Sequence, residues 1–174
     1  MKGLVRYMAA AIALVTAAMI VRSCGFVKYS FTGTSIQADV KTVTINYFEY
    51  KALRVNPSLS NDITEAMKDK FKKLTKLEEV EIDGDLEITG EITGYDVKAS
   101  SVTSNEVAAQ NRLTVTAKIN FVNRKYPEDD FEKSFSAYAD FDATNSLDAV
   151  EGSLCEEIID KLVEDIFNAS VANW

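Results

Sequence analysis

The sequence has 174 residues, of which 47% are hydrophobic and 26% charged, as is typical of a single globular domain. Its formal net charge is −8, and because the first 23 residues carry three cations and no acid, the charge without them is −11. Such an acidic chain repels polyphosphate backbones and has no basic stripe, which argues against nucleic acid as a partner.

The amino terminus has the parts of a secretion signal. Lys2 and Arg6 form a positive start, and an apolar run of about 14 residues follows over 8–21. This run is shorter than the roughly 20 apolar residues that a membrane-spanning helix needs. The sequence therefore predicts a cleaved signal peptide over residues 1–23 and a single periplasmic domain over residues 24–174.

Cys24 stands at the end of this signal. Residues 21–23 and Gly25 surround it in a pattern that resembles a bacterial lipobox, which implies that Cys24 becomes the acylated first residue of the mature chain. Acyl chains would hold the protein on a membrane without a span, since each buried methylene contributes about 0.8 kcal/mol. The alternative is an ordinary buried or free cysteine. Cys24 is not followed by an acidic run of the kind that directs some bacterial lipoproteins to the cell surface. We therefore expect a location on the periplasmic side of the outer membrane.

A strand and an amphipathic helix open the predicted domain. Residues 40–48 alternate apolar and polar side chains and are rich in β-branched residues, which predicts a half-buried strand. Pro57 can open a helix but cannot continue a strand. Behind it, apolar residues recur at steps of three and four, which predicts a helix over about residues 59–74. Acids lie early in this helix and lysines late, as the helix dipole favours.

A hairpin and a bent strand are predicted next. Residues 78–82 and 86–97 both have the pattern of strands, and the Asp83-Gly84 pair between them predicts a tight turn. Gly90 and Gly94 lie inside the second strand, where glycine marks a bulge or a bend. We therefore expect this strand to bend.

Two further strands and a helix complete the domain. Residues 113–121 alternate strictly, and a turn over 123–130 leads into a second alternating segment over 131–141. From about Ser146 onward a helix is predicted, with one apolar stripe at Leu154, Ile158, Leu162 and Ile166. The expected fold class is α+β, a two-layer sandwich with a mostly antiparallel sheet of four to five strands and two helices packed on one face.

The candidate chemical groups do not form a catalytic constellation. The chain has no histidine, which excludes serine–histidine and cysteine–histidine schemes. Adjacent carboxylates such as Asp129 and Asp130 fit a solvated surface better than a metal or acid–base site. Cys155 lies beside the apolar stripe of the last helix and fits a small buried hydrophobic residue. We expect no enzyme activity, no metal and no cofactor.

The order of several motifs resembles the LPS-assembly lipoprotein family, LptE. The motifs begin with Cys-Gly-Phe at 24–26, Phe-Thr-Gly-Thr-Ser-Ile at 31–36 and Val-Lys-Thr-Val-Thr-Ile at 40–45. Asn-Pro-Ser-Leu-Ser at 56–60 opens the first helix, Asp-Leu-Glu-Ile-Thr-Gly at 85–90 lies in a long strand, and an amphipathic helix ends the chain. The resemblance covers nearly the whole mature chain and is closest to the Bacteroidetes-type members.

This resemblance implies a binding subunit. Such a protein stands inside or against the lumen of a large outer-membrane β-barrel, LptD, helps the barrel to assemble, and acts as a plug while lipopolysaccharide passes to the outer leaflet. Some family members are held to touch lipopolysaccharide through basic residues near the loop between the long central strands. Here that loop, residues 100–110, has no Lys or Arg, so barrel contact is the first expectation. The candidate lipopolysaccharide-binding residues are Arg112, Lys118, Arg124 and Lys125.

Two other function classes stand beside the LptD-associated plug. A free-standing periplasmic lipid-binding carrier lipoprotein would share the signal and the anchor, but it would need an enclosed apolar cavity in place of a packed core. An enzyme is the third class, and the sequence supplies no histidine, no activated nucleophile and no phosphate loop for it.

Overall fold

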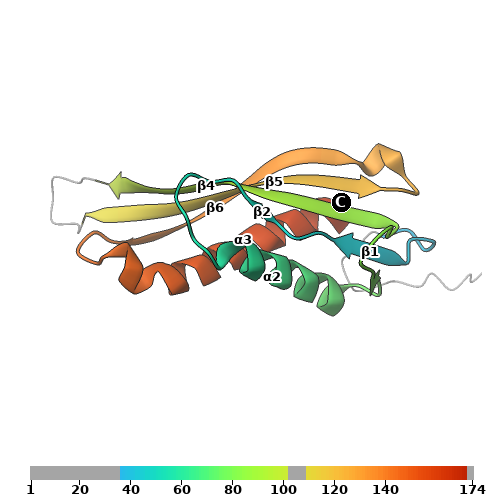
Figure 1. Ribbon diagram of the computed structural model, residues 1–174, viewed down its shortest axis with the longest axis horizontal. Coiled ribbons are helices and arrows are strands. Elements are labelled where there is room, and N and C mark those ends of the chain that lie inside the picture. The colour runs from blue at the N-terminus through green and yellow to red at the C-terminus, as the bar shows by residue number, and fades with distance from the viewer. Residues whose placement is uncertain (1–35, 102–108, 172–174) are drawn as a thin grey trace, which may run out of the picture. The chain divides into compact units, whose positions relative to one another are not determined.

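A mixed sheet forms the centre of the structure, a computed structural model that describes residues 36–101 and 109–171 (Figure 1). Neighbouring strands follow the order β3-β1-β4-β5-β6, and β2 pairs with β4. The strands are β1 (Thr42–Ile45), β2 (Glu49–Tyr50), β3 (Glu78–Glu79), β4 (Leu86–Ser101), β5 (Gln110–Asn123) and β6 (Phe131–Asp142). The long strands β4, β5 and β6 are antiparallel to one another, whereas β1 and β2 run parallel to β4.

Two helices, α2 (Leu59–Leu74) and α3 (Leu147–Val171), pack against this sheet, and a short 3-10 helix η1 (Pro127–Asp129) joins β5 to β6. The helices run in the same direction (Figure 1), with Phe71 and Phe167 in edge-to-face contact near their carboxyl ends. Neither helix of the described chain is long and apolar enough to cross a membrane. The predicted α+β sandwich is confirmed, and α2 has the predicted bounds.

The core lies between the helices and the sheet and is built from alternate strand positions, as predicted. On β5 the inward side chains are fully buried, and they are Leu113, Val115, Ala117, Ile119 and Phe121. The helix α3 adds the predicted stripe and a second buried row, which consists of Cys155, Ile159, Val163 and Phe167. The second row exists because α3 packs against α2 as well as against the sheet.

The turn at residues 83–85 does not close the predicted hairpin, because β1 lies between β3 and β4. Two hydrogen bonds between Thr42 and Asp85, one in each direction, stabilise this strand order. The Thr42 N–H donates to Asp85 Oδ2 at 3.1 Å, and the Asp85 N–H donates to Thr42 Oγ1 at 2.8 Å. Asp85 Oδ2 also accepts from the Lys41 N–H at 2.7 Å. These bonds bind the residues after the turn to β1, so the chain cannot fold back onto β3.

Removal of the Asp85 charge is expected to give a pH-dependent loss of stability. The hydrogen bond from the Lys41 N–H, followed by that from Thr42, lowers the pKa of the Asp85 carboxyl below its ordinary value of 3.8. Because the pKa is lower in the folded protein, the ionised carboxylate stabilises the fold at pH values above the ordinary pKa. This stabilisation disappears as the pH falls through the lowered pKa. Asp85→Asn should therefore cost more free energy of unfolding at pH 7 than at about pH 2, as measured by urea denaturation. Asp83→Asn is the control, and equal costs for Asp85→Asn at both pH values would contradict the prediction.

Two glycines shape β4. The strand predicted over residues 40–48 is confined to β1. Phe48 lies in the break before β2, and its completely buried ring packs over Gly90 of β4. A Cβ atom at position 90 would lie 2.4 Å from Phe48 Cδ1, so only glycine leaves room for this ring. At the other glycine the register of β4 and β5 shifts between Ile92 and Gly94, which is the kind of irregularity that glycine inside a strand marks.

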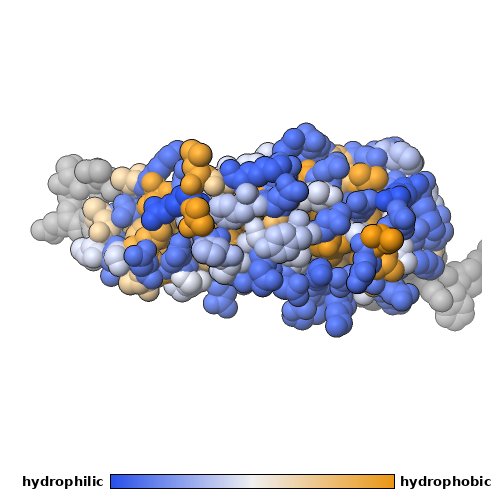
Figure 2. Space-filling model, in the orientation of Figure 1, coloured by the Kyte–Doolittle hydropathy of each residue, from blue (hydrophilic) through white to orange (hydrophobic). Residues whose placement is uncertain are grey.

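Six large apolar side chains of the described residues are exposed, and the face drawn in Figure 2 is mostly polar with separate apolar patches. They are Tyr47, Leu53, Val55, Leu74, Ile82 and Tyr138. Leu53 and Val55 lie together in the loop between β2 and α2, where Leu53 is fully exposed and Val55 is 73% exposed. This loop leads directly into the amino terminus of α2.

Candidate functional site

The residues predicted to carry the signal and the lipid lie outside the described part of the chain. This applies to residues 1–23 and to Cys24, and also to most of the loop between β4 and β5. The signal peptide and the lipidation of Cys24 therefore stay predictions.

Arg112 and Lys118, two of the predicted lipopolysaccharide-binding residues, lie on β5 and pair with acids of β6. Arg112 donates from Nε and Nη2 to the two carboxylate oxygens of Asp140 at 2.7 and 2.9 Å, and its guanidinium lies 3.7 Å from the ring centre of Tyr138. The hydrogen bond to Asp140 raises the pKa of Arg112 and lowers the pKa of Asp140. Lys118 Nζ lies 2.7 Å from Glu132. Both cations are thus neutralised within the sheet.

Arg124 and Lys125, the other two candidates, follow β5 and pair with acids at the start of β4. Arg124 contacts Glu87 at 2.7 Å and Asp83 at 3.2 Å, and Lys125 contacts Asp85 at 3.4 Å. Because a strand rises about 3.3 Å per residue, Arg112 and Arg124 lie about 40 Å apart along β5. The structure therefore does not bring the four residues together into one site.

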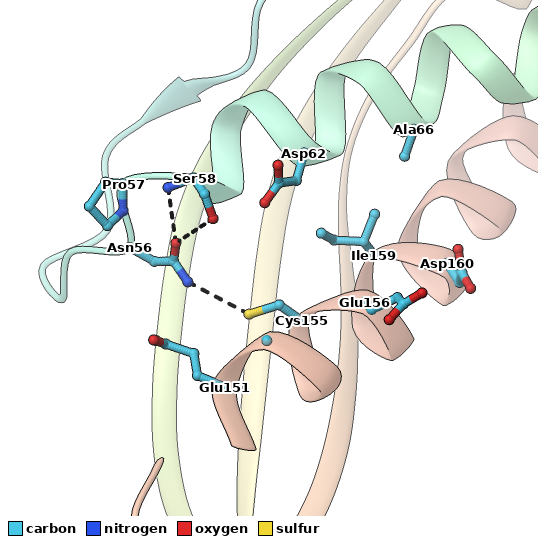
Figure 3. Close-up of a pocket in the computed structure, with 11 residues that line it drawn as sticks. Asn56, Pro57, Ser58, Asp62, Ala66, Glu151, Cys155, Glu156, Ile159 and Asp160 are labelled. Carbon is cyan, nitrogen blue, oxygen red and sulfur yellow. Dashed lines mark hydrogen bonds between the residues drawn. The ribbon is translucent and has the colours of Figure 1, made fainter. Parts of the chain in front are cut away.

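A groove between the amino-terminal halves of α2 and α3 is the candidate site that the structure adds (Figure 3). Its volume is about 630 Å³. Three segments form it: the residues before α2, the first turns of α2, and the first half of α3. The lining residues are Asn56, Pro57, Ser58, Asp62, Ala66, Glu151, Gly152, Cys155, Glu156, Ile159 and Asp160.

Asn56 closes one end of this groove and joins three parts of the fold. Its Oδ1 accepts hydrogen bonds from the backbone N–H groups of Ser58 and Leu59 at 3.1 and 3.3 Å, which satisfies donors at the start of α2. Its Nδ2 donates to Tyr95 Oη on β4 at 3.4 Å and to Cys155 Sγ on α3 at 3.6 Å. Asn56 is buried, so these bonds replace water on both sides of the amide.

The polar groups beside Asn56 are held neutral or already hydrogen-bonded. The pKa of the Tyr95 hydroxyl lies far above its usual range, mainly because the hydroxyl is buried and then because it donates a hydrogen bond to Glu151. Burial also raises the pKa of the Cys155 thiol, which is therefore not an activated nucleophile. Among the described residues, no group of acids and cysteines is arranged to hold a metal ion.

The rim of the groove is acidic and its floor is apolar. Asp62, Glu156 and Asp160 form no ion pair with a cation of the described residues. Ile159 and Ala66 supply the apolar floor. Sequence reasoning missed this groove because its residues come from segments about 100 positions apart, and the available signal was Gly152 inside a helix.

Comparison with protein families gives a match over most of the described chain. The family model described as LptE, Lipopolysaccharide-assembly, matches residues 40–170, from just before β1 to the last turn of α3. No curated protein matches the sequence.

Solved structures with a similar arrangement have low sequence identity. A hypothetical protein from Chlamydia trachomatis is 10% identical with a TM-score of 0.53, over 76% of this chain and 99% of that chain. A minor lipoprotein from Acinetobacter baumannii is 12% identical with a TM-score of 0.44, over 69% of this chain and 89% of that chain. At this identity, the likeness to the chlamydial protein shows a common fold and nothing about function.

Proposed function

Because the chain belongs to the LptE family of lipopolysaccharide-assembly proteins, we propose that it is the assembly subunit and plug of the outer-membrane β-barrel LptD. Membership places the protein in lipopolysaccharide assembly and among non-enzymatic proteins. The single observation that carries the proposal is the extent of the family match, which includes all described strands and both helices nearly to the end of α3.

The packing of the core favours this function over that of a free-standing lipid carrier. A carrier needs an enclosed apolar cavity for its ligand. Here the layer between helices and sheet is filled by large side chains such as Phe48, Met67 and Phe121, which are at most 1% exposed. The groove between α2 and α3 opens to solvent and has carboxylates on its rim. These features support a protein that binds its partner through its surface.

Direct contact with lipopolysaccharide through Arg112, Lys118, Arg124 and Lys125 is the secondary part of the proposal. Arginine binds phosphate in the same two-pronged way as it binds carboxylate. Each of the four cations already has a carboxylate partner, so a phosphate would have to replace that partner. Barrel contact therefore ranks first among the proposed activities.

Replacement of the proposed lipid anchor is expected to release the protein from the membrane. In a Cys24→Ala variant no acyl chains can attach, and two or more chains are what hold a protein stably on a bilayer. We expect the variant to appear in the soluble periplasmic fraction, whereas the unchanged protein sediments with outer membranes. Cys155→Ala is the matched control, since Cys155 is buried in α3 and should leave the fractionation unchanged. A Cys24→Ala protein that still sediments with membranes would show that lipid is not the main tether.

The proposed function is tested by purification from native membranes. A carboxy-terminally tagged protein is extracted from outer membranes in detergent, and the co-purifying proteins are identified by mass spectrometry. We expect LptD at close to one copy per copy of the tagged protein. An unrelated tagged outer-membrane lipoprotein is the control for detergent carry-over. Recovery of the tagged protein without LptD would contradict the proposal and favour the function of a free-standing lipid carrier.

A further inference from the structure

We propose that the groove between α2 and α3 docks a segment of the barrel partner in which lysine or arginine side chains flank an apolar side chain. This inference rests on the proposed function and adds to it the surface and the chemistry of the contact. The groove has an apolar floor and an acidic rim, so a segment of this kind is complementary to both.

The first argument is that the helices leave the groove open at the cost of local stability. Gly152 lies in the interior of α3, where glycine is less stable than alanine. A Cβ atom at this position would meet nothing within 4 Å, so neither close packing nor backbone geometry requires glycine here. Ala66 faces the same space from α2 and is only half-buried. Small residues on both sides keep room for side chains of another molecule.

The second argument is the charge of the rim. Glu156 and Asp160 are one helical turn apart, and like charges at this spacing destabilise a helix. Asp62 adds a third carboxylate from the facing helix. The nearest lysine in sequence, Lys161, instead pairs with Glu157 at 2.7 Å and donates to the Tyr138 carbonyl of β6 at 3.3 Å. The carboxylates of the rim are thus left for cations of a partner.

The third argument is that hydrogen bonds order the loop that leads into the groove. The Tyr50 hydroxyl donates to the Arg54 carbonyl and accepts from the Asn56 N–H at 3.2 Å, so it clamps the loop before α2. In the same loop, Leu53 and Val55 are exposed to solvent and precede Asn56, the first lining residue of the groove, in the sequence. A surface that is ordered before binding loses less conformational entropy when the partner arrives.

The charge of the rim decides between a protein segment and a lipid. Lipopolysaccharide and anionic phospholipids carry phosphates, which the carboxylates of Asp62, Glu156 and Asp160 repel. A basic segment gains from the same carboxylates and places its apolar side chain on Ile159. The glycine inside α3 and the like charges one turn apart both disfavour a helix, and such departures from the most stable sequence are expected where a surface serves binding.

The test uses charge reversal in the full chain. Asp62→Lys combined with Asp160→Lys reverses one carboxylate on each side of the groove. The control combines Glu65→Lys with Glu164→Lys, which makes the same change of charge on the same two helices outside the groove. Circular dichroism and urea denaturation should show both double variants folded. We expect at least tenfold less LptD to co-purify with the groove variant and unchanged recovery with the control.

A second variant tests the shape of the groove without a change of charge. Gly152→Leu improves the helix propensity of α3 and fills the open space with a side chain. We expect it to lower LptD recovery as well, while Gly152→Ala leaves recovery close to that of the unchanged protein. Normal LptD recovery with both the charge-reversed and the filled groove would overturn the inference while the proposed function stands.

A direct measurement separates the inference from the proposed function. The full chain in detergent is titrated with a synthetic helical peptide of alternating leucine and lysine clusters, and binding is followed by fluorescence of a label on the peptide. We expect the unchanged protein to bind at least tenfold more tightly than the charge-reversed variant, with weaker binding in high salt. Equal binding by the two proteins would overturn the inference even where LptD is recovered. Absence of LptD with intact, groove-dependent peptide binding would reject only the barrel as the source of the segment.

Discussion

Replacement of Gly90 by alanine is expected to lower the free energy of unfolding by about 3 kcal/mol, the upper part of the range for overpacked cores. The new Cβ atom would lie 2.4 Å from both Phe48 Cδ1 and Cε1 and 2.7 Å from Cζ. The ring is completely buried, so it cannot swing into solvent to relieve the contact. Without this ring, alanine would stabilise a strand relative to glycine, so the sign of the effect depends on Phe48 alone. Urea denaturation at constant m-value measures the loss.

Gly152→Ala is the matched control for this substitution. It adds the same methyl group where nothing lies within 4 Å, and it should raise the free energy of unfolding by about 0.5–1 kcal/mol through helix propensity. A double-mutant cycle with Phe48→Ala adds a further check, because the cost of Gly90→Ala should largely vanish once the ring is absent. An unchanged denaturation midpoint in Gly90→Ala alone would contradict the close contact.

Asn56→Ala is expected to destabilise the protein by about 3 kcal/mol, since it removes a helix cap and leaves buried polar groups without partners. The substitution deletes the acceptor for the N–H groups of Ser58 and Leu59. It also removes the donor to Tyr95 and Cys155, which are both buried. The midpoint temperature of thermal denaturation and the midpoint concentration of urea denaturation should both fall.

Ser58→Ala is the control that distinguishes this cap from an ordinary one. Ser58 holds the formal N-cap position of α2, yet its side chain makes no capping hydrogen bond. Its exposed hydroxyl donates to Asn56 Oδ1 at 3.2 Å, so Ser58→Ala should cost no more than about 1 kcal/mol, the usual size of one such hydrogen bond. Equal costs for Ser58→Ala and Asn56→Ala would show that α2 is not capped by the Asn56 amide.

Much of the fold could be predicted because it depends on local spacing. The bounds of α2 follow from apolar residues at steps of three and four, and the inward faces of β5 and β6 follow from strict alternation. The pairing of β1 between β3 and β4 could not be predicted, since the alternating pattern says that a segment is a strand but not which strand lies beside it. The bonds that decide this pairing join Thr42 and Asp85 across most of the first half of the domain.

The candidate site was less accessible to sequence reasoning than the fold. Arg112 and Lys118 were identified as cations, but the carboxylates that neutralise them lie on β6, and only the strand register shows this. The groove depends on three segments that meet only in the folded chain. Gly152 is unfavourable for a helix on its residue type alone, but its neighbours across the groove are not visible in the sequence.

The position of β1 also bears on the order in which the protein folds. Thr42 and Asp85, which bind each other, are 43 residues apart, whereas β4, β5 and β6 form a meander of consecutive strands. Contacts between distant segments require a larger loss of chain entropy, so we expect the meander to form the folding nucleus and β1 to join it later. The segment that is synthesised first therefore finds its neighbours late. A chain of this topology stays open at its amino-terminal part until β4 is available, and a late-closing fold of this kind is what the predicted secretion signal would require.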